Sequence, residues 1–208
     1  MPSHESFWDK IADKYDRRTV KGPNYAARLD RVAGWVGPEA RVLDVGCAGG
    51  QISIDLAKRV GSVHGIDVGG RLIALARQRA QREGVGGVTF TKIPIEDSML
   101  DGKSYDAITA FAVLHLVDDC AATLARMHEV LRPGGRLIIE VPYIGDWGLP
   151  IRALIRGMQL VGKAPPIHFF KQAQFEAMLR DTGFQIEESK VYNPKARQQY
   201  LLVRKPGG

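Results

Sequence analysis

The sequence contains little that could hold a fold together covalently or through a metal. Only two cysteines, Cys47 and Cys120, occur among 208 residues, and neither has metal-ligand spacing. A disulfide framework and a cysteine-based zinc site are therefore excluded as organising features. A chain of this length can bury a sufficient core without them, and its 45% hydrophobic and 25% charged content is typical of a globular protein. We expect one domain over residues 1–208, two reduced thiols and no bound metal.

Long apolar runs are also missing. No stretch reaches the roughly 18 apolar residues that a membrane-spanning helix needs. The first ten residues, MPSHESFWDK, lack the apolar core of a secretory signal. Both observations predict a cytoplasmic protein.

Acidic residues are outnumbered, 23 against 29 Lys and Arg, which gives a net charge of +6. Such a balance is compatible with nucleic acid or anionic lipid as a partner. The basic residues are spread along the chain, however, so a solvated basic surface is the favoured interpretation. Charge alone leaves peripheral membrane contact open and selects no partner.

Short apolar runs alternate with stretches of helical periodicity. The runs that indicate buried parallel strands are 40–46, 62–67, 88–93, 105–111 and 136–142, the last preceded by a turn at 133–135. The stretches that indicate helices are 7–15, 25–35, 50–59, 71–83 and 119–131. Two final strands, 183–192 and 198–205, are joined by a loop with Asn193 and Pro194 that is too short for a parallel crossover. The order predicts an α/β fold with a seven-stranded, mostly parallel sheet, an antiparallel hairpin at its end and helices on both faces.

A glycine-rich loop follows the first expected strand, in VLDVGCAGGQ (42–51). Ligands of open parallel sheets bind at the carboxyl ends of the strands, and Gly46, Gly49 and Gly50 would let backbone approach a ligand there. A dinucleotide site needs G-x-G-x-x-G. From Gly46 onward this chain has Gly-Cys-Ala-Gly-Gly-Gln, without the second and third required glycines. The loop therefore argues against NAD.

Two carboxylates accompany this loop. Asp44 stands two residues before Gly46, where it would repel a pyrophosphate and favour a cationic ligand that carries an ammonium and a sulfonium group. Asp67 ends the second expected strand, where a carboxylate can accept both hydroxyls of an adenosine ribose. Alternatively, Asp67 caps the helix that starts near Arg71. S-adenosylmethionine fits this pattern better than NAD does.

The sequence resembles the class I S-adenosylmethionine-dependent methyltransferases over most of its length. Residues 42–50 are similar to the family motif V-L-D-x-G-C-G-x-G, with Ala48 in place of one glycine. Further blocks resemble the family in order and spacing, namely GIDV (65–68), IPIED (93–97), SYDAITAFAVLHLVDD (104–119) and LRPGGRLII (131–139). The resemblance implies a Rossmann-like fold, transfer of a methyl group from S-adenosyl-L-methionine, and a small, lipophilic or aromatic acceptor of quinone type.

The resemblance also implies which residues contact the cofactor. Residues 1–38 would form a helical lid over it, and the stretch at 93–97, with Pro94 where the family often has aspartate, would close over adenine. The implied set is Tyr15, Asp44, Gly46, Cys47, Ala48, Gly50, Asp67, Val68, Ile95, Glu96, Phe111 and Ala112.

Acceptor contacts are expected beside the methyl group. His115 is the candidate general base, with a purely structural histidine as the alternative. Trp8 is expected in ordinary core packing rather than against a ligand. The candidate acceptor-binding residues are Tyr25, His115, Tyr143, Trp147 and His168.

An insertion at 145–170 follows the fifth strand. Apolar residues recur there at helical spacing, and a basic side accompanies them. Three interpretations stay open: a lid over a lipophilic acceptor, a helix lying on an anionic membrane, and an amphipathic helix covering the sheet.

Two other functions compete with small-molecule methylation. Methyltransferases that act on base amines resemble D/N-P-P-Y/F after strand four, and this chain has Ala110-Phe111-Ala112-Val113 there, so nucleic acid is disfavoured as a partner. A non-catalytic S-adenosylmethionine-binding module is the second alternative. The acceptor atom and the oligomeric state stay undetermined.

Overall fold

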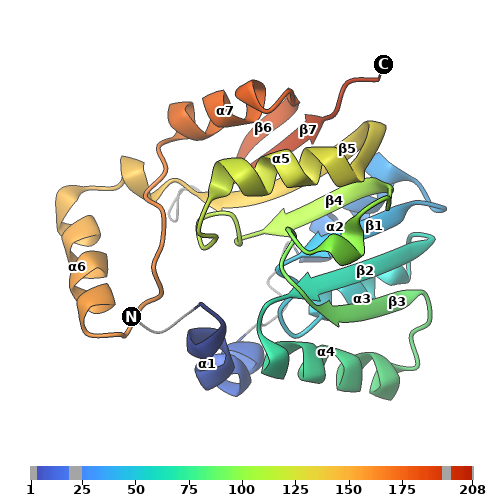
Figure 1. Cartoon of the computed structure of the whole chain (residues 1–208), viewed down its shortest axis with the longest axis horizontal. Helices are drawn as coiled ribbons and strands as arrows, with labels where there is room; N and C mark the ends of the chain where they lie inside the picture. The colour runs from blue at the N-terminus through green and yellow to red at the C-terminus, as the bar shows by residue number, and fades with distance from the viewer. Residues whose placement is uncertain (1–3, 19–24, 194–197, 208) are drawn as a thin grey trace.

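A single seven-stranded sheet forms the centre of the computed structural model, which describes residues 4–18, 25–193 and 198–207. The strand order is β3-β2-β1-β4-β5-β7-β6 (Figure 1). The strands are β1 (Arg41–Val45), β2 (Ser62–Asp67), β3 (Val88–Lys92), β4 (Tyr105–Phe111), β5 (Leu131–Pro142), β6 (Gln185–Asn193) and β7 (Gln198–Arg204). Pairing is parallel from β3 to β5, whereas β7 runs antiparallel to both β5 and β6. The predicted sheet with its closing antiparallel hairpin is confirmed.

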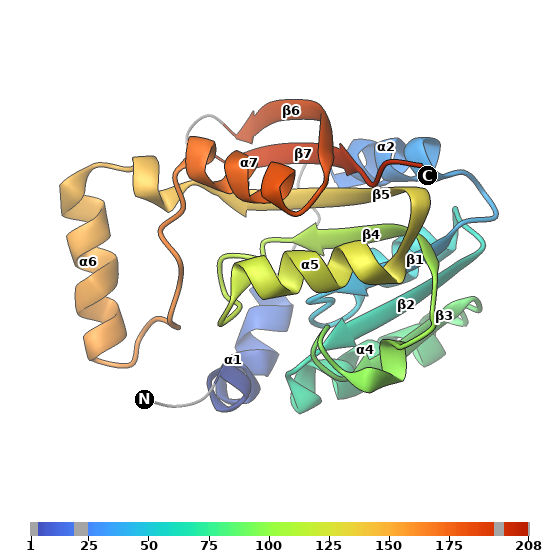
Figure 2. The same ribbon diagram turned by 45° about the horizontal axis from the view of Figure 1, so that its top comes forward.

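Helices cover both faces of this sheet (Figure 2). On one face lie α2 (Tyr25–Val36), α3 (Gln51–Ala57) and α4 (Gly70–Glu83), and on the other lie α5 (Cys120–Val130) and α7 (Gln172–Asp181). Successive strand residues serve opposite faces, as the period of a strand requires: Val42 packs with α2 and α3, whereas Leu43 packs with α5 and α7. The central parallel strands β1 and β4 are consequently buried on both sides.

Two helices lie outside these layers. The first, α1 (His4–Arg18), packs against α4, and the second, α6 (Leu149–Leu160), stands apart from the sheet (Figures 1 and 2). Single 3₁₀ turns occur at η1 (Ser98–Leu100) and η2 (Ile144–Asp146). No residue of α6 is buried, so the interpretation of this helix as a cover for the sheet is wrong.

The fifth strand begins earlier than its sequence predicts. The turn expected at 133–135 is an irregularity inside β5, because Leu131 already pairs with Tyr105 and the ladder resumes at Arg136 opposite Ala107. Gly134, at φ +74°, supplies the left-handed backbone there, and its N–H donates to the carbonyl of Lys205. Pairing with the C-terminal segment converts the expected turn into a bulged extension of the strand.

Gly50 begins α3 at the closest approach between the glycine loop and the neighbouring helix. It has φ +75°, and an added Cβ would lie 2.7 Å from Ala76 Cβ and 2.7 Å from Phe90 Cζ. Gly50→Ala should therefore lower the free energy of unfolding by about 2–4 kcal/mol, from backbone strain and overpacking together. Gly84→Ala is the matched control, because Gly84 has φ +61° but open space around it, and it should cost about 1 kcal/mol. Urea unfolding measures both, and equal losses would contradict the packing argument.

Candidate active site

A cavity of about 360 Å³ opens at the carboxyl ends of β1, β2 and β4. Its volume lies in the range of small-ligand sites. The residues that line it are Trp8, Val45, Gly46, Ala48, Ile66, Asp67, Val68, Leu72, Ile93, Pro94, Ile95, Glu96, Phe111, Ala112, Val113, Leu116, Val117, Asp118, Asp119 and Ala122. Eight residues of the predicted cofactor set belong to this wall: Gly46, Ala48, Asp67, Val68, Ile95, Glu96, Phe111 and Ala112.

The charges on this wall all have one sign. Four carboxylates line the cavity, from Asp67, Glu96, Asp118 and Asp119, and no Lys, Arg or His is among the described lining residues. In a protein of net charge +6 this is a local reversal. Carboxylates around an otherwise apolar cavity favour a cationic ligand and repel a pyrophosphate.

Asp67 reaches across the cavity floor at the end of β2. Its Oδ2 accepts the Ala48 N–H at 3.0 Å, and its Oδ1 accepts the Gly69 N–H at 2.8 Å. Burial raises the pKa of Asp67, and the hydrogen bonds from these two backbone groups act in the opposite direction. The carboxylate thus ties the glycine loop to the start of α4 and stands where a ribose is expected.

Asp44 lies beneath the loop rather than in the cavity wall. It is 3% exposed, and its carboxylate accepts hydrogen bonds from Ser53 Oγ at 2.5 Å and Thr109 Oγ1 at 2.7 Å. Because Ser53 belongs to α3 and Thr109 to β4, Asp44 fixes the helix and the strands around the loop. Its charge acts on a ligand from below, through protein, where attraction persists at low dielectric.

The loop itself approaches the cavity as bare backbone. Gly46 has φ +72°, and an added Cβ would lie 2.6 Å from Val113 Cγ2 on the opposite wall. Ala48 holds the left-handed region at φ 48° despite its Cβ, and Ala112 across the cavity does so at φ 52°. Cys47 points away into the packing of α3 and α4, where burial raises the pKa of its thiol.

Glu96 and Ile95 form the side of the cavity after β3. Glu96 Oε1 accepts a hydrogen bond from Thr123 Oγ1 at 2.8 Å, which connects this wall to α5. Pro94 also lines the cavity, in the position where the family resemblance predicts an aspartate. The polar groups on this side of the cavity are therefore the Glu96 carboxylate and the backbone around it.

Helix α1 closes the cavity with Trp8, which the sequence assigned to core packing. The helix is held on α4 by ion pairs, with Arg71 Nη2 2.9 Å from Asp13 Oδ1 and Arg79 Nη2 2.7 Å from Asp16 Oδ2. Arg79 also donates to the carbonyl of Gly49, so this residue of α4 is bonded both to α1 and to the glycine loop. The side chain of Tyr15 lies outside the described residues.

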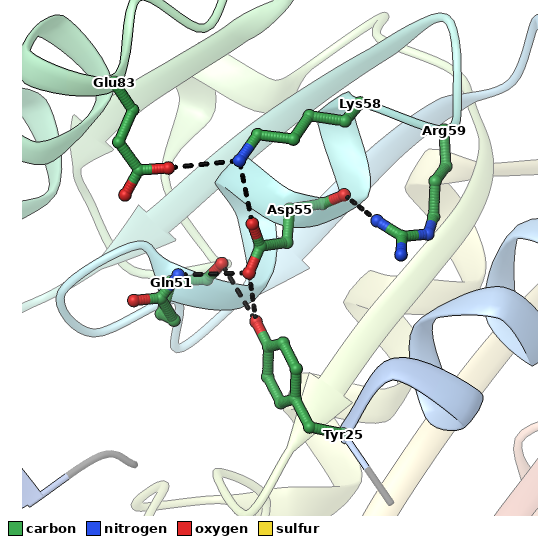
Figure 3. Close-up of polar contacts among 6 residues, drawn as sticks. All are labelled: Tyr25, Gln51, Asp55, Lys58, Arg59 and Glu83. Carbon is green, nitrogen blue, oxygen red and sulfur yellow. Dashed lines mark hydrogen bonds and ion pairs between the residues drawn. The ribbon is translucent and has the colours of Figure 1, made fainter. Parts of the chain in front are cut away.

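Tyr25, predicted to contact the acceptor, lies in a polar cluster between α2 and α3 (Figure 3). Its hydroxyl donates to Asp55 Oδ2 at 2.9 Å and contacts the Gln51 carbonyl oxygen at 3.1 Å. Lys58 joins Asp55 to Glu83 of α4, with 3.0 and 3.1 Å from its Nζ to the two carboxylates. Tyr25 is not among the residues that line the cavity.

The remaining predicted acceptor residues, His115, Tyr143, Trp147 and His168, are not among those that line the cavity and belong to segments beside the β4–α5 loop. His168 donates its backbone N–H to His115 O at 2.8 Å, and its Nε2 lies 2.8 Å from the Val117 carbonyl oxygen. The His168 ring stacks on Phe170, whose carbonyl accepts the N–H of Gly145 in the turn between Tyr143 and Trp147. This cluster adjoins the cavity at Val117.

Three buried polar atoms of this cluster have no partner among the described residues: His115 Nδ1, Tyr143 Oη and Trp147 Nε1. Leaving a buried polar atom unpaired costs about 1–3 kcal/mol, so such a concentration calls for an explanation. Burial raises the pKa of Tyr143, with Glu176 and Asp146 adding to the effect. The cluster therefore presents neutral hydrogen-bonding groups that a ligand could satisfy.

Sequence reasoning missed Leu116, Val117, Asp118 and Asp119 as parts of the wall. Asp119 could have been placed from the sequence, because an aspartate directly before a helical stretch is a typical N-cap. In the structure it caps α5 by accepting the Ala122 N–H at 3.0 Å. The part of the chain that the structure describes contains no group of three or more His, Cys, Asp or Glu residues arranged to hold a metal ion.

His115 makes stability depend on pH. Burial, with repulsion from His168, lowers the pKa of His115 from 6.5 to about 4. The unfolded chain binds a proton at His115 near pH 6.5, whereas the folded chain binds it only near pH 4. The free energy of unfolding is therefore highest above pH 6.5, where His115 is neutral in both states, and it decreases as the pH falls from 6.5 to about 4. The loss should be about 3 kcal/mol.

Urea unfolding of the wild type and of His115→Gln at a series of pH values isolates this histidine from His64 and the others. The difference between the two free energies should shrink as the pH falls from about 7 to 4. Parallel curves would show that His115 has an unperturbed pKa.

Comparison with known proteins agrees with this geometry. The family described as "Methyltransferase domain" matches residues 37–195. Ubiquinone biosynthesis O-methyltransferase of Xanthomonas axonopodis pv. citri (strain 306) is 30% identical, with 97% of this chain and 90% of the relative covered. The enzyme of the same name from Acinetobacter baumannii (strain ACICU) is 33% identical, over 83% of this chain and 75% of the relative.

Solved structures share the fold at lower identity. Magnesium protoporphyrin IX methyltransferase from Synechocystis PCC 6803, with bound S-adenosylhomocysteine, has a TM-score of 0.73 at 20% identity, over 97% of each chain. The [4+2]-cyclase SpnF also has a TM-score of 0.73, at 17% identity, over 98% of this chain and 95% of that one. Taken with the family match and the curated relatives, the acid-lined cavity beside the glycine loop identifies this chain as a member of the class I S-adenosylmethionine-dependent methyltransferases, an enzyme whose cofactor is S-adenosyl-L-methionine.

Proposed function

We propose that this methyltransferase acts on a hydroxyl of a small, lipophilic acceptor of phenol or quinol type. The observation that carries the proposal is the pairing of two adjoining compartments, the acid-lined cavity and the buried cluster of His115, Tyr143 and Trp147. The first fits a cation, and the second offers unpaired hydrogen-bonding groups among aromatic side chains. The names of the curated relatives, which are ubiquinone biosynthesis O-methyltransferases, support an oxygen acceptor of this class.

When bound, S-adenosylmethionine supplies a methyl carbon on a positively charged sulfur. Asp67 would accept the ribose hydroxyls, and Glu96 with the backbone of Ile95 would bound the adenine. The positive charge of the ligand would be offset by the carboxylate of Asp44 beneath the glycine loop and by the carboxylates that line the cavity. Phe111, Ala112 and Val113 would line the reacting end and exclude water.

Methyl transfer to oxygen requires the attacking atom to lie in line with the methyl carbon and the sulfur, so positioning carries much of the rate enhancement. His115 was predicted as a general base. A histidine whose pKa is lowered to about 4 is a poor proton acceptor at neutral pH. In this proposal His115 instead orients the acceptor hydroxyl through a hydrogen bond, together with Tyr143.

The proposal includes peripheral contact with a membrane, because a lipophilic acceptor partitions into bilayers. No helix within residues 4–18, 25–193 and 198–207 is long and apolar enough to cross one. A cytoplasmic location remains a prediction from the sequence.

Asp67→Ala should weaken binding of S-adenosylmethionine and S-adenosylhomocysteine by about tenfold or more, since the ribose loses its acceptor. Asp97→Ala is the matched control, because Asp97 lies just outside the cavity wall and only caps η1. Isothermal titration calorimetry with both ligands and with NAD gives the affinities. Unchanged affinity in Asp67→Ala would refute the ribose placement, and tight binding of NAD alone would refute the cavity assignment.

His115→Gln should raise the acceptor KM and lower kcat by about tenfold at most, because an orienting hydrogen bond is lost but no base. The measurement is steady-state methylation of a panel of phenols and quinols, with amines and carboxylic acids as comparison acceptors. A loss of kcat of about 10² or more, with a pH–rate limb abolished by the substitution, would restore His115 as the base. Turnover confined to amines or acids would refute the proposed acceptor class.

A further inference from the structure

Helix α6 concentrates the exposed apolar surface of the molecule. Among the described residues, seven large hydrophobic side chains are exposed, and only Met99 lies elsewhere. The other six belong to α6 or directly follow it: Leu149, Ile151, Leu154, Met158, Leu160 and Val161. Exposed apolar side chains concentrated on one element in this way mark an interaction site.

The apolar residues form a face because of their spacing. Ile151, Leu154, Met158 and Val161 recur at the three- and four-residue intervals that place side chains on one side of a helix. Leu154 is 63% exposed and Val161 is 66% exposed, so nothing in the described chain covers this face. The opposite side of α6 rests on the chain that returns from it, through Gln159 Nε2, which donates to the Pro165 carbonyl at 2.9 Å.

The charge around this face has one sign. From Asp146 to Glu176 the intervening chain contains four Lys and Arg residues and no Asp or Glu. Arg156 and Arg152 lie on the other side of α6, toward the returning chain, with their guanidinium carbons 4.5 and 5.9 Å from the centre of the Phe169 ring. Lys163 follows the helix and is exposed. A helix with one apolar face and with cations on its other side matches the interface of an anionic bilayer, in which apolar side chains enter the acyl region and cations meet the headgroups.

We propose that α6 lies in the plane of an anionic membrane and docks the enzyme there. The inference deepens the proposed function and rests on it for the lipophilic acceptor that the bilayer would supply. A second copy of this chain fits less well, because two cationic faces would repel each other. A lid directly over the cavity also fits less well, because no residue of α6 lines that cavity and the helix stands away from the sheet (Figure 2).

The segment after α6 connects this surface to the site. Phe169, under the two arginines, is followed by Phe170, and His168 before it contacts the carbonyl of Val117 at the cavity wall. A helix held on a bilayer would therefore hold the cavity mouth close to the same surface. An acceptor could then pass from the membrane to His115 and Tyr143 without crossing bulk water.

The test is co-sedimentation of the full chain with phospholipid vesicles, without cofactor or acceptor. One set contains phosphatidylcholine alone, and the other contains about one phosphatidylglycerol in three lipids. The wild type should bind the anionic vesicles about tenfold or more tightly than the neutral ones, and salt should weaken that binding.

Leu154→Asp should reduce binding to anionic vesicles by about tenfold or more, because a charge then stands in the apolar face. Ala153→Asp is the matched control: it adds the same charge to an exposed position of the same helix, about 100° away from Leu154, and should lose much less. Met99→Asp, at the exposed apolar residue outside α6, should bind like the wild type.

Absence of vesicle binding by the wild type would overturn the proposal. Equal losses of binding in Leu154→Asp and Ala153→Asp would also overturn it, because the added negative charge would then explain the loss wherever it stands on the helix. A lipid-free dimer that Leu154→Asp dissociates in analytical ultracentrifugation would assign the face to a second copy instead. Calorimetric cofactor affinity should be unchanged in Leu154→Asp. Failure of vesicle binding with intact cofactor binding and acceptor turnover would thus refute the membrane surface alone, and loss of turnover on every phenol and quinol would refute the proposed function alone.

Discussion

The shortage of space around the loop between β1 and α3 determines what the cavity can hold. Gly46 faces Val113, Gly50 faces Ala76 and Phe90, and Gly65 in the adjacent strand faces Phe90, each at distances that would not admit a Cβ. The floor of the site is therefore backbone, and the carboxylate of Asp67, which accepts the Ala48 N–H, is the polar side chain beside it. Core packing on one side of the loop and the binding surface on the other are consequences of the same close approach.

Electrostatics adds a second constraint that runs against the overall charge. The chain carries +6, yet its cavity is lined by four carboxylates and Asp44 is buried directly below. Cations are placed elsewhere: Arg71 and Arg79 hold α1 on α4, and Arg152 and Arg156 of α6 lie over the Phe169 ring. Attraction for a cationic cofactor and attraction for anionic lipid can coexist in one small protein because the two sets of charges are separated in space.

The sequence predicted the parallel part of the fold well because its central strands are short, largely buried apolar runs, and the first two end beside Gly46 and at Asp67. The bounds of β2 and β4 agree with the predicted runs, and Asp67 lies at the strand end where its role was expected. Prediction failed where distant segments decide the outcome. The start of β5 depends on pairing with Tyr105 and Lys205, and the direction of Asp44 depends on Ser53 and Thr109, none of which spacing alone reveals.

The same limit applies to the site residues. Tyr25 was placed at the acceptor because aromatic residues in the N-terminal segment of similar enzymes cover the ligand, but Asp55 on α3 attracts its hydroxyl. Trp8 was placed in the core because its spacing fits an amphipathic helix, but ion pairs between α1 and α4 bring it to the cavity wall. Helical periodicity predicts which side chains face the rest of the protein. It does not predict whether such a side chain packs in the core or lines a ligand cavity.

Because a methyltransferase and a [4+2]-cyclase share this fold, the layered sheet cannot by itself select the reaction. The cofactor half of the site is built from strand ends and a backbone loop, elements that any chain with this topology must possess. The acceptor half, in the function we propose, is built from what lies between β4 and α5 and between β5 and α7, where the fold tolerates insertion. Within the part of the chain that the structure describes, His115, Tyr143 and Trp147 keep buried polar atoms unpaired there, at an energetic cost that packing alone does not explain. On the proposed function, selection of the acceptor depends on these two connections, and α6, which belongs to one of them, would link that selection to the membrane surface from which the acceptor arrives.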